Sequence, residues 1–106
     1  MTDKIVVFST ASSAEEAEKI ARVLVEERLA ACVNVLPGAR SVYRWKGAIE
    51  SSAEWVLIIK SSRERFERLC ARLEKIHSYE TPEVMALAVV DGSSNYLNWL
   101  DAELSE

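Results

Sequence analysis

The residues whose types could carry chemistry are a single histidine, His77, and two cysteines, Cys32 and Cys70. Imidazole nitrogens and thiolates are good ligands for copper and zinc. Cys70 and His77 share one stripe of a predicted helix, but about 10 Å of helix axis separates them, so they cannot reach one metal ion within a subunit. Cys32 belongs to a predicted strand and approaches His77 only through the tertiary fold or across a subunit boundary. His77 is therefore either a metal ligand or a histidine that ends a helix, where the helix dipole favours it. The thiols equally fit small buried side chains.

Other reactive groups have simpler explanations. The serines do not form a G-x-S-x-G motif, and they cluster at predicted helix starts, where capping accounts for them. Two carboxylate pairs, Glu50 with Glu54 and Glu80 with Glu83, could attract a hard cation. A tight site needs several converging oxygens, so we interpret these four as solvated charges at the rim of the fold.

Composition limits the class of protein. The chain has 106 residues, 17 acidic and 13 basic, for a net charge of -4. A surface that binds nucleic acid needs clustered lysine and arginine, so no nucleic-acid partner is expected. No apolar run approaches the roughly 20 residues that span a bilayer, and the N-terminus lacks the layout of a signal peptide. We expect one domain over residues 1–106, cytoplasmic, with free thiols and no membrane association.

Hydrophobic periodicity alternates between strand and helix patterns along the chain. Ser13 and Glu16 are predicted to form a capping box at the first helix. Pro37 and Gly38 interrupt the second strand, which predicts an edge strand or a bulge there. The expected elements are strand Lys4–Thr10, helix 12–30, strand Ala31–Trp45, strand Glu50–Ser61, helix 61–77, strand 83–91 and helix 93–106. This order predicts the ferredoxin-like βαββαβ fold of the α+β class, with an antiparallel sheet and a C-terminal helix.

The hairpin formed by the second and third strands is longer than a minimal fold requires. Strands usually have five or six residues, so this hairpin should extend past the helices that cover the sheet. Tyr43 and Trp45 lie near its tip, where packing against another chain is the favoured role of an aromatic ring. Exposed strand edges invite pairing, and a closed oligomer protects them. The sequence therefore predicts an oligomer.

Four segments together resemble one family. They are "RLAACVNVLPGARSVYRWKGAIE", "EWVLIIKS", "HSYETPEVMAL" and "NYLNWL", and in this order they are similar to the CutA family of divalent-cation-tolerance proteins. The similarity runs from the first strand to the last helix. The resemblance implies a ferredoxin-like subunit in a tight homotrimer, related in architecture to the PII signalling proteins. It also implies association with copper or other divalent cations, and no established enzymatic reaction.

This chain has only some of the residues that act as metal ligands in the family. Cys32 matches the cysteine of the family's "AACVN", and His77 matches a histidine that a proline usually follows, where this chain has Ser78. Copper sites described for some members use a cysteine of the first strand and two adjacent histidines. The matching positions here hold Ser9, Ile76 and His77. Because only one of these three ligands is present, the resemblance implies weaker metal binding or different ligands, with His77 and Cys32 as the candidates.

The resemblance also implies a site between subunits. Five residues of this chain match family positions that lie near the clefts between subunits in such trimers: Tyr43, Trp45, Lys60, Tyr79 and Glu83. The leading hypothesis is a homotrimeric divalent-cation response protein that binds copper or another metal weakly and is not an enzyme. The alternative is a PII-like sensor with a small ligand in these clefts.

Two other functions of this topology fit the residues less well. An acylphosphatase-type enzyme needs an arginine in a phosphate cradle after the first strand, and "STASSAEE" has none. An RNA-recognition module needs aromatic rings on the central strands and a basic sheet face. "IVVFST" and "EWVLIIK" offer few rings, and the net charge has the opposite sign.

Overall fold

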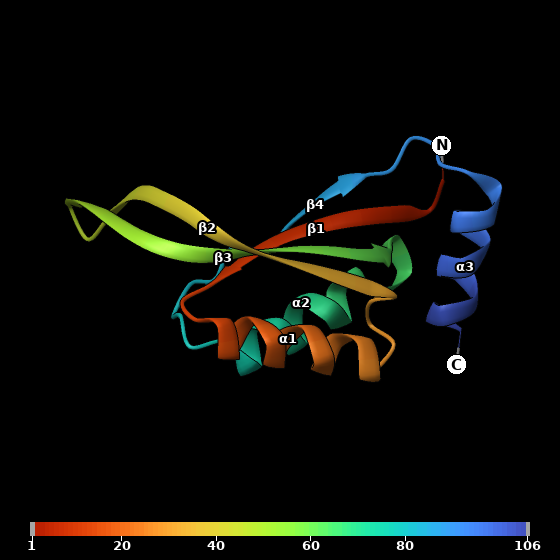
Figure 1. The fold of residues 1–106 in the computed structure, drawn as a ribbon, viewed down its shortest axis with the longest axis horizontal. Helices are drawn as coiled ribbons and strands as arrows, with labels where there is room; N and C mark the ends of the chain where they lie inside the picture. The colour runs from red at the N-terminus through yellow and green to blue at the C-terminus, as the bar shows by residue number, and fades with distance from the viewer. Residues whose placement is uncertain (1, 106) are drawn as a thin grey trace.

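A computed structural model describes residues 2–105 of the chain. The four strands form one sheet of order β2-β3-β1-β4 in which every neighbouring pair is antiparallel. Helices α1 and α2 cover one face of it (Figure 1). The predicted ferredoxin-like fold with a C-terminal helix is therefore confirmed. The elements are β1 Lys4–Ala11, α1 Ala14–Glu26, β2 Cys32–Trp45, β3 Ala48–Ser62, a 3-10 turn Arg63–Arg65, α2 Phe66–Ile76, β4 Met85–Ala88 and α3 Ser94–Leu104.

The long hairpin follows its local sequence closely. Lys46 and Gly47 have φ values of 50° and 86°, so they form a two-residue turn in the left-handed region, and β3 begins at Ala48 rather than at Glu50. The pairing of β2 with β3 shifts between Leu36 and Ala39, around Pro37 and Gly38. Since β2 is also an edge strand, the interruption lies where proline and glycine are tolerated. The bulge and the edge position are both confirmed.

The core lies between the sheet and the two helices. Ile20 and Leu24 of α1 and Leu69 and Leu73 of α2 are completely buried. Val7, Leu57 and Ile59 on the central strands complete this cluster. In each helix the two residues are four positions apart, which places them on one stripe facing the sheet. The helical periodicity thus identified the buried side of both helices.

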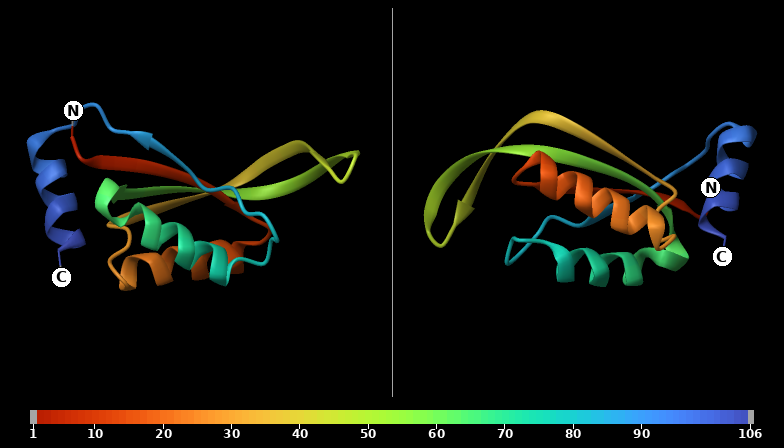
Figure 2. Two further views of the ribbon diagram at one scale, coloured as in Figure 1. Left: turned by 180° about the vertical axis from the view of Figure 1, so that it is seen from behind. Right: turned by 60° about the horizontal axis from the view of Figure 1, so that its bottom comes forward.

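The opposite face of the sheet is apolar and open. Successive strand residues point to opposite faces, so the neighbours of the buried Ile5 and Val7 point away from the helices. The strand register brings the open-face side chains side by side: Val6, Phe8, Ile58, Met85 and Leu87. Met85 is 57% and Leu87 47% exposed. None of the described helices covers this face (Figure 2).

The hairpin and α3 lie at opposite ends of the molecule. The hairpin extends beyond α1 and α2, and the longest dimension of the chain is 45 Å (Figure 1). Val42 and Ile49 near its tip are more than 60% exposed. No helix in residues 2–105 combines the length and the apolar composition that crossing a membrane requires.

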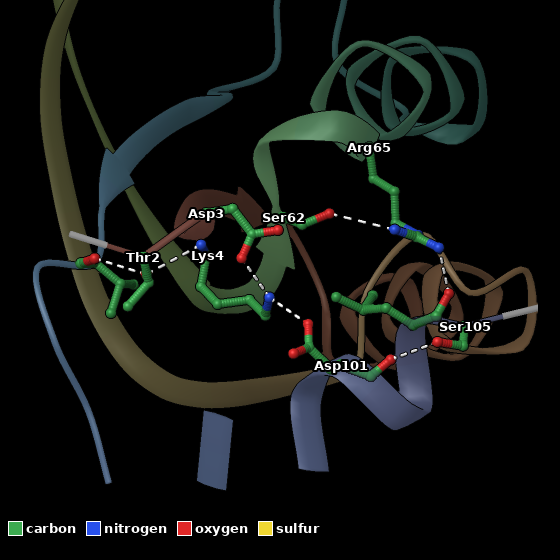
Figure 3. A network of polar contacts seen from close by, with 9 residues as sticks. Thr2, Asp3, Lys4, Ser62, Arg65, Asp101 and Ser105 are labelled. Atoms are coloured by element: carbon green, nitrogen blue, oxygen red, sulfur yellow. Dashed lines mark hydrogen bonds and ion pairs between the residues drawn. The ribbon is translucent and has the colours of Figure 1, made fainter. Parts of the chain in front are cut away.

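A polar network fastens α3 to the sheet (Figure 3). Lys4 of β1 is only 3% exposed, and its Nζ lies 2.5 Å from a carboxylate oxygen of Asp3 and 2.5 Å from one of Asp101 in α3. Burial lowers the pKa of Lys4, but these two carboxylates raise it more. Arg65 donates hydrogen bonds to Ser62 and to the carbonyl of Leu104. These contacts hold the last helix beside the ends of β1 and β3.

Candidate functional site

His77 lies directly after α2 and closes it. Its backbone is extended, and its side chain is completely buried. The Nε2 atom lies 2.7 Å from the carbonyl oxygen of Thr10 at the end of β1. The backbone N–H of Tyr79 donates to Nδ1 at 3.0 Å. Because Nδ1 accepts and a carbonyl only accepts, the geometry assigns the ring proton to Nε2.

This hydrogen bonding leaves His77 without a free nitrogen lone pair. Nδ1 carries the only lone pair of the neutral ring, and the Tyr79 amide already uses it. A metal ion could bind Nδ1 of His77 only by displacing that amide. His77 could act as a general base only after the same hydrogen bond had broken. The structure thus shows His77 joining the end of β1 to the segment that follows α2.

Glu16 of α1 contacts the same junction, the region where the end of β1 meets the segment after α2. Its carboxylate accepts hydrogen bonds from the backbone N–H of Ser78 at 2.8 Å and of Ser12 at 3.2 Å. Ser13 caps the helix by accepting from the Glu16 N–H, as the capping box predicts. The second half of that prediction is wrong, because the Glu16 side chain reaches Ser12 and Ser78 rather than the N–H of Ser13. The carboxylate therefore connects two segments that are distant in sequence.

The protonation of Glu16 should make stability depend on pH. Burial raises the pKa of Glu16, but the hydrogen bonds from Ser78 and Ser12 lower it more, from 4.5 to about 2. A carboxylate with a depressed pKa in the folded state stabilises the fold above its unfolded pKa, and this contribution is lost as the pH falls. We expect the Glu16→Gln variant to unfold more easily than wild type at pH 6. The difference should shrink between pH 4.5 and 2, as measured by urea unfolding.

The exposed neighbour Glu15 provides the control for this measurement. Glu15→Gln makes the same chemical change on the same helical turn and should leave the free energy of unfolding close to wild type throughout. A Glu16→Gln deficit that is constant from pH 6 to pH 2 would contradict the role of the carboxylate charge.

Cys32 lies far from His77 within one chain. It opens β2 and pairs with Lys60, which in turn pairs with Val6 of β1. Thr10, the partner of His77, is four residues further along β1, or about 13 Å. The Lys60 Nζ lies 3.8 Å from the Cys32 sulfur and donates a hydrogen bond to Asn34. Cys32 and Lys60 thus share the open face of the sheet.

The donors of one chain do not fit a complete metal site. Within residues 2–105, no three histidine, cysteine, aspartate or glutamate side chains converge on a point. At the two other positions that match the family's copper ligands, Ser9 is completely buried and Ile76 packs against the core. The structure therefore supports no single-chain ligand set built around His77.

A cavity of about 600 Å³ lies between the hairpin and the segment after α2. Four of the five residues predicted near a subunit cleft line it: Tyr43, Trp45, Tyr79 and Glu83. The fifth, Lys60, is on the open face of the sheet with Cys32. The structure thus collects most of this candidate site around one cavity of a single chain. The family resemblance predicts that a second subunit borders this cavity.

Glu54 also lines this cavity, and its predicted position at the solvated rim of the fold is wrong. It is only 5% exposed, whereas a solvated rim charge was expected. The Tyr79 hydroxyl donates to its Oε2 at 2.5 Å, which joins β3 to the segment after α2. Burial raises the pKa of Tyr79, and the hydrogen bond to Glu54 raises it further. Its place in "AEWVLIIKS", directly before the apolar run of the strand, was the available signal for burial.

The comparisons with known proteins agree on one family. Residues 5–103 match the family model described as CutA1 divalent ion tolerance protein. The divalent-cation tolerance protein CutA of Thermus thermophilus is 45% identical over 95 residues, which cover 90% of this chain and 92% of that protein. Chloroplastic CutA of Arabidopsis thaliana is 45% identical over 96 residues, or 91% of this chain and 53% of that protein.

Solved structures give the same result. The crystal structure of CutA from Xylella fastidiosa has a TM-score of 0.95 at 44% identity and covers 98% of this chain and 100% of that one. The CutA structure from Archaeoglobus fulgidus, described as a periplasmic divalent cation tolerance protein, has a TM-score of 0.93 at 37% identity, covering 96% and 99%. The relatives from Thermus thermophilus and Archaeoglobus fulgidus are named for divalent-cation tolerance, and none of these names supports the PII-like alternative. The chain belongs to the CutA1 family of divalent ion tolerance proteins.

Proposed function

We propose that this protein acts in the cellular response to divalent cations such as copper, as a homotrimer that binds these ions weakly and catalyses no reaction. Membership of the CutA1 family along residues 5–103 is the observation that carries the cation role. The hydrogen bonding of His77 supports the absence of a catalytic step, since its ring has no free lone pair to act as a base.

The open face of the sheet supports the homotrimer. It gathers Phe8, Ile58, Met85 and Leu87 where no described helix covers them. Contiguous apolar surface of this kind marks an interaction site in soluble proteins. The hairpin, with its exposed Val42 and Ile49, extends from the same sheet and offers unpaired strand edges. Copies packed around a three-fold axis would bury both features.

The same arrangement affects where a metal ion could bind. Cys32 begins β2 on the open face, so copies that meet there would add ligands that one chain lacks. His77 is the weaker candidate, because a metal ion would have to break its bond with Tyr79. We propose Cys32, with groups of a neighbouring subunit, as the first ligand to test.

Metal titration with a mass measurement tests this proposal. Copper(II) and zinc(II) should bind saturably to the reduced protein by calorimetry without air, with free thiols counted before and after. Sedimentation equilibrium should give three times the 11.9 kDa chain mass. Cys32→Ser should weaken metal binding, and Cys70→Ser on α2 is the matched control that should not. No saturable binding of either ion would contradict the metal role, and a monomer mass would contradict the homotrimer.

The cytoplasm is the compartment we propose. Cys32 and Cys70 are free thiols, as expected in a reducing compartment. The relative from Archaeoglobus fulgidus is described as periplasmic, so fractionation of cells that express the protein is the deciding measurement.

A further inference from the structure

A second groove lies on the outer side of the two helices, between the end of α1 and α2. Its volume of about 400 Å³ is within the roughly 300–1,000 Å³ that small-molecule sites occupy. Its lining residues are Glu27, Leu29, Arg68, Ala71, Arg72 and Lys75. The helices cover the sheet face opposite the open apolar face (Figure 2). The groove would therefore stay accessible in an assembly whose copies meet through the open face.

This groove carries a surplus of positive charge on an acidic protein. Three of its lining residues are basic and one is acidic, whereas the whole chain has a net charge of -4. Arg68, Arg72 and Lys75 follow one another at spacings of four and three, so they share one stripe of α2. Like charges at these spacings repel one another, and an anion beside them relieves the repulsion.

Glu27 neutralises only one of these three cations. Its two carboxylate oxygens accept hydrogen bonds from Arg72 Nε at 3.0 and 3.1 Å, and Oε2 also accepts from Nη2 at 2.9 Å. These bonds lower the pKa of Glu27, so it is ionised at neutral pH. Within residues 2–105, Arg72 Nη1 donates to no other group, and Arg68 and Lys75 form no ion pair. Two whole cations and one guanidinium nitrogen thus remain available to an anion.

The chemistry of these donors suits a phosphoryl group. Guanidinium groups donate paired N–H bonds to phosphate oxygens, and a phosphate monoester carries nearly two negative charges at neutral pH. This charge matches the surplus of the lining. Leu29 and Ala71 add carbon surface against which an organic substituent can pack.

A long polyanion fits the same surface less well. Glu26, Glu67 and Glu74 are exposed on the same two helices but outside the lining of the groove. They would repel a nucleic acid that extended beyond it, since such binding needs clustered basic residues along the phosphate backbone. The volume and the distribution of charge therefore favour a small anion.

We propose that the groove between α1 and α2 binds the phosphoryl group of a phosphate monoester, held by Arg68, Arg72 and Lys75. The organic part of the ester would lie against Leu29 and Ala71. The groove faces away from the surface where copies are proposed to meet, and it contains neither His77 nor Cys32. The site is therefore separate from both the homotrimer contacts and the proposed metal ligands.

The test uses the full chain after EDTA treatment, at pH 8, with three probes that share a phenyl ring. Phenyl phosphate is a dianion, benzenesulfonate is a monoanion and phenol is neutral. Calorimetry should show saturable binding of phenyl phosphate, with the largest amide chemical shifts along residues 27–29 and 68–75. Benzenesulfonate should bind about threefold more weakly or worse, and phenol should not saturate. Raising the salt concentration from about 0.02 M to about 0.3 M should weaken phenyl phosphate binding, because salt screens exposed charges.

Variants locate the site by changes of opposite sign. Arg68→Gln and Lys75→Gln should each weaken phenyl phosphate binding about fivefold. Glu27→Gln removes the one acidic group of the groove and frees Arg72, so it should strengthen binding about threefold. Arg22→Gln is the matched control, an equal loss of charge on α1 outside the groove, and should bind as wild type does. All four substituted residues are exposed, so each variant should fold.

Vesicles distinguish a soluble ester from a lipid headgroup, since both carry the same phosphoryl chemistry. Phenyl phosphate binding without co-sedimentation on phosphatidic acid vesicles would assign the site to soluble esters. Co-sedimentation that Arg68→Gln abolishes and Arg22→Gln retains would assign it to a headgroup.

Three results would overturn the proposal. The first is no saturable binding of phenyl phosphate to the wild-type protein, and the second is equal binding of all three probes. The third is an equal effect of Arg68→Gln and Arg22→Gln, which would show that only the net charge of the protein matters. A metal titration of the same sample reports separately on the proposed cation response.

Discussion

The His77→Ala variant is expected to lose about 2–4 kcal/mol of the free energy of unfolding. The substitution removes the hydrogen-bond partner that the ring gives to the buried carbonyl of Thr10 and to the part-buried backbone N–H of Tyr79. An unsatisfied buried donor or acceptor costs about 1–3 kcal/mol, and the lost packing of a completely buried ring adds to it. Guanidinium unfolding at one fixed protein concentration, followed by circular dichroism, measures the change.

A residue of the preceding turn supplies the matched control. Lys75→Ala alters an exposed side chain of α2, so its stability should stay within about 0.5 kcal/mol of wild type. Unchanged stability of His77→Ala would show that the ring does not hold the junction. Loss of copper binding in that stable variant would make His77 a ligand instead.

The Phe8→Lys variant is expected to convert the proposed homotrimer into monomers. The register places Phe8 between Ile58 of β3 and Met85 of β4, in the middle of the open apolar face. An unpaired ammonium taken out of water costs several kcal/mol, and a trimer would contain three of them. The helix-facing core is untouched, so each chain should keep its secondary structure. Sedimentation equilibrium should show the mass falling from three chain masses to one.

A lysine on the other side of the molecule controls for the added charge. Val25 is a 41% exposed apolar residue of α1, and Val25→Lys should leave the assembly mass as in wild type. A Phe8→Lys protein that keeps the wild-type mass would show that copies meet through a different surface. Loss of helix and strand signal together with the mass would show instead that Phe8 belongs to the core of the single chain.

Local sequence patterns predicted the fold well, because short-range physics decides these features. The helical spacing of residues such as Ile20 and Leu69 identified the buried stripes. Pro37 and Gly38 predicted the irregular edge strand, since proline cannot donate to a sheet ladder. Element boundaries were less accurate. The turn conformation of Lys46 and Gly47 lengthened β3, and the 3-10 turn Arg63–Arg65 delayed α2.

The candidate site was predicted less completely, because its contacts join segments far apart in the chain. Tyr79 and Glu83 were predicted as site residues and line the cavity, whereas Glu54 was predicted to be a solvated charge and lines it as well. The burial of Glu54 depends on Tyr79, which is 25 residues away in sequence and adjacent only after the sheet and α2 have packed. Glu16 likewise finds Ser78 only in the folded chain.

The sequence by itself determined the order of elements, the buried stripes and the family resemblance, because these depend on residue spacing and identity along the chain. Only the tertiary structure decided which neighbours and hydrogen-bond partners the ionisable groups have. It engaged both nitrogens of His77, placed Cys32 on the open face and enclosed Glu54 in a cavity with aromatic rings. The physical reason is that lone pairs, burial and charge depend on the neighbours of a side chain in space, and strand pairing and helix packing choose those neighbours.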